Sequence, residues 1–392
     1  MNNQVASCIT LAFLFVACGE QRVAPTAPAE FRLDVSSSLS TTEVVEGSIG
    51  PGALYKMVKP ANWNGTLLVY AHGSTTANTP NTLPITGARF ADALVPEGVA
   101  VVFSSFSESG WNIKDGAQRT HQLTGLFTSK FGRPTTTIVA GQSMGGLIAI
   151  KLAEDYPTQY AGSLPICSVA GGTRLQAEYD AHVWALFEYF YPGVLPGNAA
   201  SLPADVDWFT QIYLPAVNAM YGNPAPVAKI ASLKQTPVPG TDFDARVEGI
   251  AYALGLNQFF LGSLVPSGAP YFDNSSTTYA SAALPPSDLQ MINVAVRRYT
   301  ASPNVLNALD KNYTPSGKLR RPMLMLSGSF DANVPAFNQT SYLAAATTEG
   351  SLQFLVQRTL PSDSHCGYPF GDKVTAFRDL LTWTKTGVKP AP

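Results

Sequence analysis

The sequence predicts an α/β fold in which a mostly parallel central sheet carries helices on both faces and a large helical insertion. Short apolar segments alternate with helix-like segments before residue 174 and again after residue 300, and such alternation is typical of a parallel sheet. Between these positions the sequence is helical in pattern and dense in aromatic residues. The chain has 392 residues, of which 45% are hydrophobic and 13% are charged, so it can form a large core.

The predicted strands are short and mostly apolar, which indicates that the sheet is covered on both faces. In the first part of the chain they comprise residues 53–58, 66–71, 99–105, 136–140 and 162–168. The predicted helices that connect them comprise residues 87–98, 115–132 and 144–157. The strand pattern returns at residues 321–329 and 351–360, and residues 371–387 form the last predicted helix.

This pattern divides the chain into a signal, a tether, a core and a cap. We expect residues 1–18 to be an export signal, and residues 19–42, which are rich in Ala, Pro, Ser and Thr, to be a flexible tether. Residues 43–173 and 301–392 form the predicted core. Residues 174–300 form the predicted helical cap or lid, which is inserted between two strands of the core.

Residues 8–18, CITLAFLFVAC, form an apolar block that is too short to span a bilayer. With Gly19 after it, the block resembles a bacterial lipoprotein signal, in which cleavage before the cysteine leaves Cys18 N-terminal and lipidated. This resemblance implies an exported outer-membrane lipoprotein that touches the membrane through its lipid anchor alone. The alternative is an ordinary secretory signal, which would make the protein periplasmic or secreted.

The charge and the metal-binding residue types argue against two classes of ligand. The formal net charge is −2 and Lys and Arg form no cluster, so no nucleic-acid partner is expected. The four histidines include no H-x-x-x-H pair and the cysteines include no C-x-x-C pair, so no metal site is expected. No cofactor is implied.

A serine between glycines is the strongest sign of chemistry. Residues 138–150, IVAGQSMGGLIAI, contain the pattern G-x-S-x-G centred on Ser143, with a predicted strand before it and a predicted helix after it. A tight strand-to-helix turn of this kind holds the serine in a strained backbone conformation with Oγ exposed at the carboxyl edge of the sheet. The helix N-terminus also favours developing negative charge there. We therefore predict that Ser143 is a nucleophile; the alternative is a packing turn with an inert serine.

A nucleophilic serine needs a base and an acid that orients the base. On this motif the chain resembles the α/β-hydrolase superfamily, in which the three residues follow in the order Ser, Asp or Glu, His. That resemblance implies His365, in a loop between the last strand and the last helix, as the base, rather than His182 in the insertion. It implies Asp331, just after a buried strand, as the acid. Asp363 is the weaker candidate, because a turn role is more natural for it.

The resemblance also implies an oxyanion hole made of two backbone N–H groups. The residue after the nucleophile, Met144, supplies one of them. The turn His72-Gly73 after an earlier strand implies the N–H of Ser74 as the other. We expect the His72 side chain to hold that turn by hydrogen bonds rather than to take part in the reaction.

Two cysteines, Cys167 and Cys366, remain once the signal is removed and Cys18 is lipidated. Export makes a disulfide between them possible. Tannases and fungal-type feruloyl esterases also place a cysteine directly after the catalytic histidine, and they pair it with a cysteine just before the serine. This chain has Gln142 at that position, so we expect Cys167 as the partner instead. The alternative is two unrelated buried thiols.

These features together predict an exported serine hydrolase that cleaves a small-molecule or polymeric carboxylic ester through an acyl-enzyme intermediate. A peptidase of the prolyl-oligopeptidase type is an alternative, although the sequence lacks the repeats of a β-propeller. An acyltransferase or a lipase is another alternative. A lipoprotein that only binds a ligand on a hydrolase scaffold is a non-enzymatic alternative, and the presence of all three predicted catalytic residues argues against it.

Overall fold

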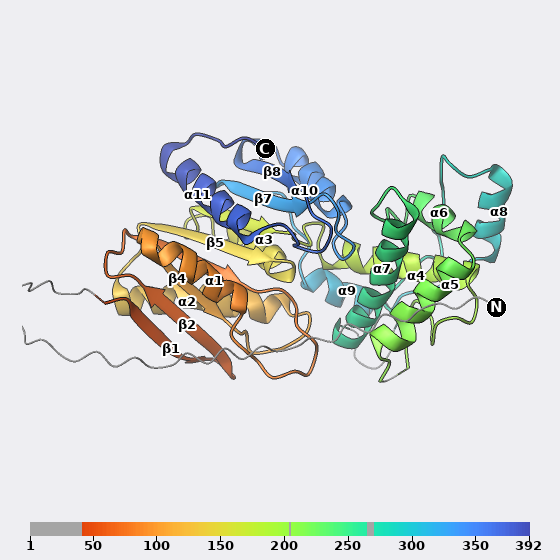
Figure 1. Ribbon diagram of the computed structural model, residues 1–392, viewed down its shortest axis with the longest axis horizontal. Coiled ribbons are helices and arrows are strands. Elements are labelled where there is room, and N and C mark those ends of the chain that lie inside the picture. The colour runs from red at the N-terminus through yellow and green to blue at the C-terminus, as the bar shows by residue number, and fades with distance from the viewer. Residues whose placement is uncertain (1–40, 204, 265–269) are drawn as a thin grey trace, which may run out of the picture. The chain divides into compact units, whose positions relative to one another are not determined.

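The computed structural model describes residues 41–203, 205–264 and 270–392, so the predicted signal, Cys18 and almost all of the tether lie outside the described residues. Across the described residues, eight strands form one sheet in the order β1-β2-β4-β3-β5-β6-β7-β8 (Figure 1). β2 pairs antiparallel with β1 and β4, and the other neighbours are parallel. The strands are β1 (Glu43–Ile49), β2 (Ala53–Lys59), β3 (Thr66–Ala71), β4 (Ala100–Ser104), β5 (Thr136–Gln142), β6 (Gly162–Ile166), β7 (Met323–Gly328) and β8 (Leu355–Leu360).

Helices cover both faces of this sheet, as the apolar strands predict. One face packs against α1 (Ile85–Leu94) and α11 (Phe370–Thr386), which bury Phe90 and Phe377. The other face packs against α2 (Ile113–Phe131), α3 (Met144–Asp155) and α10 (Phe337–Thr348). The predicted α/β fold class is therefore confirmed.

The edge strand β1 was not among the predicted strands. Its residues are largely exposed, and among the strands of the described residues it pairs with β2 alone, so it has no apolar stretch. Two cross-strand ion pairs, Lys59–Glu43 and Lys56–Glu46, both 2.9 Å long, connect it to β2. Charged side chains of this kind are common on edge strands, because they oppose pairing with another chain.

The chain between β6 and β7 is helical. Together with the sheet it forms one compact unit, Ser40–Pro392. α4 packs against α6, α7 and α9, and the centre of this packing buries Trp184, Phe187 and Tyr271. None of the helices in the described part of the chain is both long enough and apolar enough to cross a membrane. The elements of the insertion are α4 (Thr173–Phe190), the π-helical turn η2 (Trp208–Tyr213), α5 (Leu214–Gly222), α6 (Ala225–Ser232), α7 (Phe243–Leu264), α8 (Pro286–Ala295) and α9 (Pro303–Lys311).

Candidate active site

The predicted site residues lie where parallel strands end. His72 directly follows β3, Ser143 follows β5 and Cys167 follows β6. The loops after β7 and β8 carry Asp331 and His365. Because the carboxyl ends of parallel strands meet at one edge of a sheet, these five residues are brought to the same edge.

Ser143 has φ 57° and ψ −122°, a backbone conformation that is strained for a residue with a side chain. Its N–H donates a 2.9 Å hydrogen bond to the carbonyl of Ile166 in the next strand. A Cβ on Gly141 would collide with the carbonyl of Gly145, and one on Gly145 would collide with the carbonyl of Ala71. The two glycines of the motif therefore let three backbone segments approach closely enough to form the turn.

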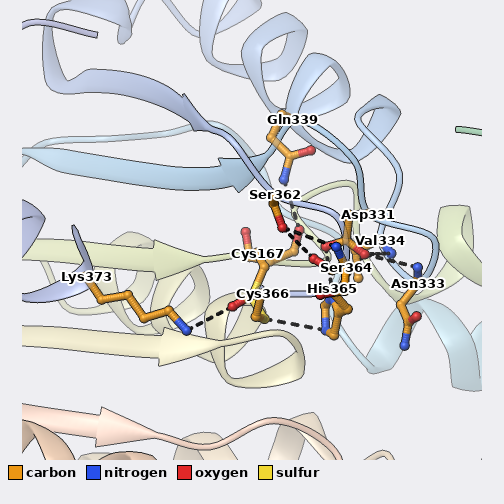
Figure 2. The surroundings of a disulfide bond; sticks show 11 residues. Cys167, Asp331, Asn333, Val334, Gln339, Ser362, Ser364, His365, Cys366 and Lys373 are labelled. Atoms are coloured by element: carbon orange, nitrogen blue, oxygen red, sulfur yellow. Dashed lines mark hydrogen bonds and ion pairs between the residues drawn. A yellow bond between two sulfur atoms is a disulfide. The ribbon is translucent and has the colours of Figure 1, made fainter. Parts of the chain in front are cut away.

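Asp331 and His365, which the superfamily resemblance implies as acid and base, are joined by a hydrogen bond. His365 Nδ1 lies 2.7 Å from Oδ2 and 3.0 Å from Oδ1 of Asp331 (Figure 2). Asp331 is buried, and Oδ1 also accepts hydrogen bonds from the N–H groups of Asn333, at 3.0 Å, and Val334, at 2.8 Å. Since a carboxylate accepts, the His365 Nδ1–H donates and Nε2 is left to take a proton.

Among the described residues, no hydrogen bond joins the alternative acid, Asp363, to the histidine ring. It is exposed, and its Oδ1 accepts a 3.1 Å hydrogen bond from the hydroxyl of the adjacent Ser364. Its position matches the turn role that was expected for it.

Ser143 and His365 line the same pocket, which has a volume of about 490 Å³. No hydrogen bond joins the two side chains in the described part of the chain; instead, His365 Nε2 lies 3.6 Å from Cys366 Sγ. Catalytic hydrogen bonds are often long before substrate binds. Trp111, Val169, Leu256 and Val334 give the pocket apolar walls.

The two predicted oxyanion-hole residues lie next to Ser143. Met144 is the first residue of α3, and a helix leaves its first N–H groups without an intrahelical acceptor. Ser74 lines the pocket beside Ser143. A Cβ on Gly73 would lie 3.2 Å from the Cβ of Ser143, so this turn and the serine turn are in contact.

The side chain of His72 supports this turn by a hydrogen bond and by ring stacking. Its Nδ1–H donates a 2.6 Å hydrogen bond to the carbonyl of Gly73, and its ring stacks on Phe106 with 3.8 Å between ring centroids. Burial lowers the pKa of His72, which favours the neutral ring. These contacts agree with a structural role.

Comparison with known proteins identifies the fold. An esterase from Aspergillus oryzae superposes with a TM-score of 0.51 at 14% identity, over 89% of this chain and 80% of the other. The chain has the α/β-hydrolase fold. Feruloyl esterase B from Aspergillus oryzae, at 13% identity over 88% and 81% of the two chains, has a TM-score of 0.48. Proline iminopeptidase from Mycobacterium smegmatis, at 12% identity over 89% and 100%, has a TM-score of 0.45.

Sequence comparison adds a match to part of the chain. The family described as "Putative esterase" matches residues 93–229, about a third of the chain, including the Ser143 turn. No curated protein matches the sequence.

The predicted partner of Cys366 is also found. Cys167 and Cys366 form a disulfide, with Cα atoms 5.4 Å apart (Figure 2). Because Cys366 directly follows His365 and Cys167 directly follows β6, the bond connects the histidine loop to the sheet.

Lys373 is a further support of this loop that sequence reasoning missed. It extends from α11, and its buried Nζ donates a 3.1 Å hydrogen bond to the carbonyl of Cys366 (Figure 2). Burial lowers the pKa of the Lys373 amine to about 8, with a smaller contribution from the charge of Arg89. The only sign in the sequence is a lysine near the start of a helix whose neighbours are apolar.

A buried polar network, also unforeseen, links α4 to the loop that carries Asp331. Gln176 Nε2 donates to the carbonyl of Asn333 at 3.2 Å, and Gln176 Oε1 accepts from Asn338 Nδ2 at 2.9 Å. The same Nε2 donates to Asp180 Oδ1 at 3.2 Å. Burial raises the pKa of Asp180 well above its ordinary value, so this carboxyl is held in its neutral form.

The remaining histidines lie away from the pocket. His182 Nδ1 lies 3.0 Å from the hydroxyl of Tyr279 inside the insertion, and burial lowers the pKa of His182 to about 4. His121 Nδ1 lies 3.1 Å from the hydroxyl of Tyr160, with its ring stacked on Tyr156. Both histidines pack against aromatic side chains.

Within the described part of the chain, one group of side chains has donor atoms close enough together for a metal ion. Donor atoms of Cys167, His365 and Cys366 lie within 4.8 Å of one another. Metals bind the thiolate form of cysteine, whereas these two sulfurs are bonded to each other. This donor set therefore does not fit a metal ion.

Proposed function

We propose that the protein is a serine esterase that cleaves carboxylic esters through an acyl-enzyme intermediate. The observation that carries the proposal is that a strained serine and a histidine bonded to a buried aspartate line one pocket. The α/β-hydrolase fold and the match of residues 93–229 to an esterase family support hydrolysis, and the family favours esters over peptides.

In the proposed reaction, Ser143 Oγ attacks the acyl carbon while His365 Nε2 takes the hydroxyl proton. Asp331 accepts from Nδ1–H throughout and stabilises the charged imidazolium. The N–H groups of Met144 and Ser74 bind the oxyanion, each with an effect of about 3 kcal/mol as measured for such donors in other enzymes.

The tetrahedral intermediate then collapses. The bond to the alkoxy oxygen breaks, and His365 returns its proton to the leaving alcohol. Water attacks the acyl-Ser143 ester with His365 as base, the acid is released, and Ser143 regains its proton. The sizes of the alcohol and acyl groups decide which esters fit into the pocket.

Labelling combined with a substrate panel tests this proposal. We expect a fluorophosphonate probe to label Ser143 and to inactivate hydrolysis of p-nitrophenyl acetate; Ser129→Ala, which alters an exposed serine on α2, should label normally. Cleavage of peptide anilides without cleavage of esters would instead favour a peptidase, and acyl transfer in preference to hydrolysis would favour a transferase. Absence of labelling at Ser143 would refute the assignment.

We further propose that the protein is exported and anchored by lipid at Cys18. The apolar block before Cys18 supports this, and so does the disulfide, because disulfides persist in oxidising compartments.

A further inference from the structure

Four aromatic side chains form an exposed cluster on the insertion, which we name the aromatic shelf. Phe209 stacks on Tyr213, with 5.6 Å between their centroids, and Tyr213 lies 5.7 Å from Tyr252. Trp208 lies 5.4 Å from Tyr213 and 6.0 Å from Tyr252. Trp208 is 39% exposed and Phe209 is 47% exposed, so solvent reaches a surface made of rings. The shelf consists of Trp208, Phe209, Tyr213 and Tyr252.

The backbone is built to bring these rings together. Trp208, Phe209 and Tyr213 belong to the π-helical turn η2, in which the N–H of Leu214 bonds to the carbonyl of Phe209, five residues back. Hydrogen bonds of this spacing bring residues five apart in sequence onto one face of the helix, as for Trp208 and Tyr213. Single π-helical turns are rare and occur frequently at functional sites.

The shelf borders the pocket through α7. Residues four apart share a helix face, so Glu248, Tyr252 and Leu256 form one line along α7. Leu256, at one end of this line, lines the pocket that contains Ser143. Glu248 lies at the other end, and burial, followed by the negative charge of Asp363, raises the pKa of its carboxyl group. Tyr252 therefore lies one helical turn from Leu256, a residue of the pocket wall.

Trp208 reaches the same border. A Cβ on Gly255 would lie 2.9 Å from Cε3 of Trp208, so the ring rests on the α7 backbone beside Leu256. A larger residue at position 255 would push the ring away from the pocket.

We propose that the aromatic shelf binds the part of the substrate that extends beyond the pocket, and that it selects neutral esters bearing an aromatic ring. This inference rests on the proposed esterase function. Its basis is continuity, because Trp208 packs on α7 at Gly255, next to Leu256 in the pocket wall. Exposed ring faces bind other rings by offset or edge-to-face contact. The carboxyl group of Glu248, one turn from Tyr252 on α7, disfavours an anionic substrate group.

Kinetics on matched esters test the proposal. Methyl phenylbutanoate carries a ring, methyl octanoate an alkyl chain, and ethyl acetate is too short to leave the pocket. In Trp208→Ala and Phe209→Ala we expect the ratio of kcat/KM for the phenyl ester to that for ethyl acetate to fall about three- to tenfold, mainly through KM. Val294→Ala removes an 80% exposed side chain from α8, outside the shelf, and should leave this ratio unchanged. An unchanged ratio in Trp208→Ala, or an equal fall for methyl octanoate, would overturn the selection of rings.

A binding measurement on inactive variants distinguishes failure of this inference from failure of the proposed function. Methyl phenylbutanoate is titrated into Ser143→Ala and into Ser143→Ala/Trp208→Ala by calorimetry, so no turnover is needed. A dissociation constant about three- to tenfold higher in the double variant would support the shelf even if the wild-type protein cleaved no ester. An equal dissociation constant would overturn the shelf even if esters were cleaved. A change from dimer to monomer, or loss of sedimentation with lipid vesicles, in Trp208→Ala with unchanged phenyl-ester binding would assign the shelf to another occupant.

Discussion

Backbone strain at Ser143 is the residue-scale feature from which the rest of the site follows. A non-glycine residue at φ 57° costs about 1–3 kcal/mol, and neighbouring structure must offset this cost. The hydrogen bond to Ile166 and the close glycine packing around the turn do so. The result is a serine hydroxyl held at the sheet edge and open to the pocket.

The hydrogen bond between His365 and Asp331 predicts that hydrolysis needs the carboxyl group of Asp331 and not that of Asp363. Asp331→Asn should lower kcat for ester hydrolysis by about four orders of magnitude, because the amide favours the wrong histidine tautomer. Asp363→Asn is the matched control, since Asp363 lies in the histidine loop but bonds only to Ser364. Steady-state kinetics on both variants decide the matter: a crippled Asp363→Asn together with an active Asp331→Asn would contradict the account.

At the scale of elements, the contacts that hold the loop between β8 and α11 include the bond of His365 to Asp331, the disulfide of Cys366, and the hydrogen bond from Lys373. The disulfide closes a separation of 199 residues, for which a chain-entropy estimate gives about 5 kcal/mol. Cys167→Ser/Cys366→Ser should therefore unfold at lower denaturant concentration and lose activity as the loop loosens. Equal denaturation midpoints for the variant and the wild type would show that the bond contributes nothing to stability.

The buried carboxyl of Asp180 predicts a pH dependence of stability. Its folded-state pKa is raised, so between the ordinary and the raised value the unfolded chain releases a proton that the folded protein keeps. The free energy of unfolding therefore falls as pH rises through that interval and is flat above it. Asp180→Asn, which keeps an oxygen acceptor for Gln176, should remove this fall and raise Tm at neutral pH, by about 2–4 °C for each 1 kcal/mol gained. Thermal melts across pH, with Asp363→Asn as control, check this; a Tm in Asp180→Asn that matches wild type at every pH would contradict it.

The strands and helices that could be predicted are those whose own residues show the apolar pattern of a buried element. β3 and β5 are apolar throughout most of their length, and the Ser143 motif needs only its flanking strand and helix to be interpreted. β1 escaped prediction because its one neighbour leaves it exposed. Lys373 and Gln176 escaped because their partners lie elsewhere in the chain, at Cys366 and Asn333. The aromatic density of the insertion was visible in the sequence, but the grouping of four rings beside the pocket depends on the packing of η2 on α7.

For the whole molecule, the proposed lipid anchor at Cys18 predicts that the protein is attached to a membrane. If Cys18 is lipidated, mass spectrometry of the mature protein should find a diacylglyceryl cysteine at its N-terminus, and the protein should fractionate with membranes. Cys18→Ser should release it or block processing, while Cys8→Ser, which alters the signal itself, is the matched control. An unacylated N-terminus produced by cleavage at another residue would contradict this.

The whole account depends on a pocket in which one serine does the chemistry. The most direct measurement is kcat for hydrolysis of p-nitrophenyl acetate by Ser143→Ala, with Ser129→Ala as control and circular dichroism to show that both variants are folded. The account predicts a loss of roughly three or more orders of magnitude for Ser143→Ala and wild-type activity for Ser129→Ala. A folded Ser143→Ala protein that kept most of the activity would contradict the account.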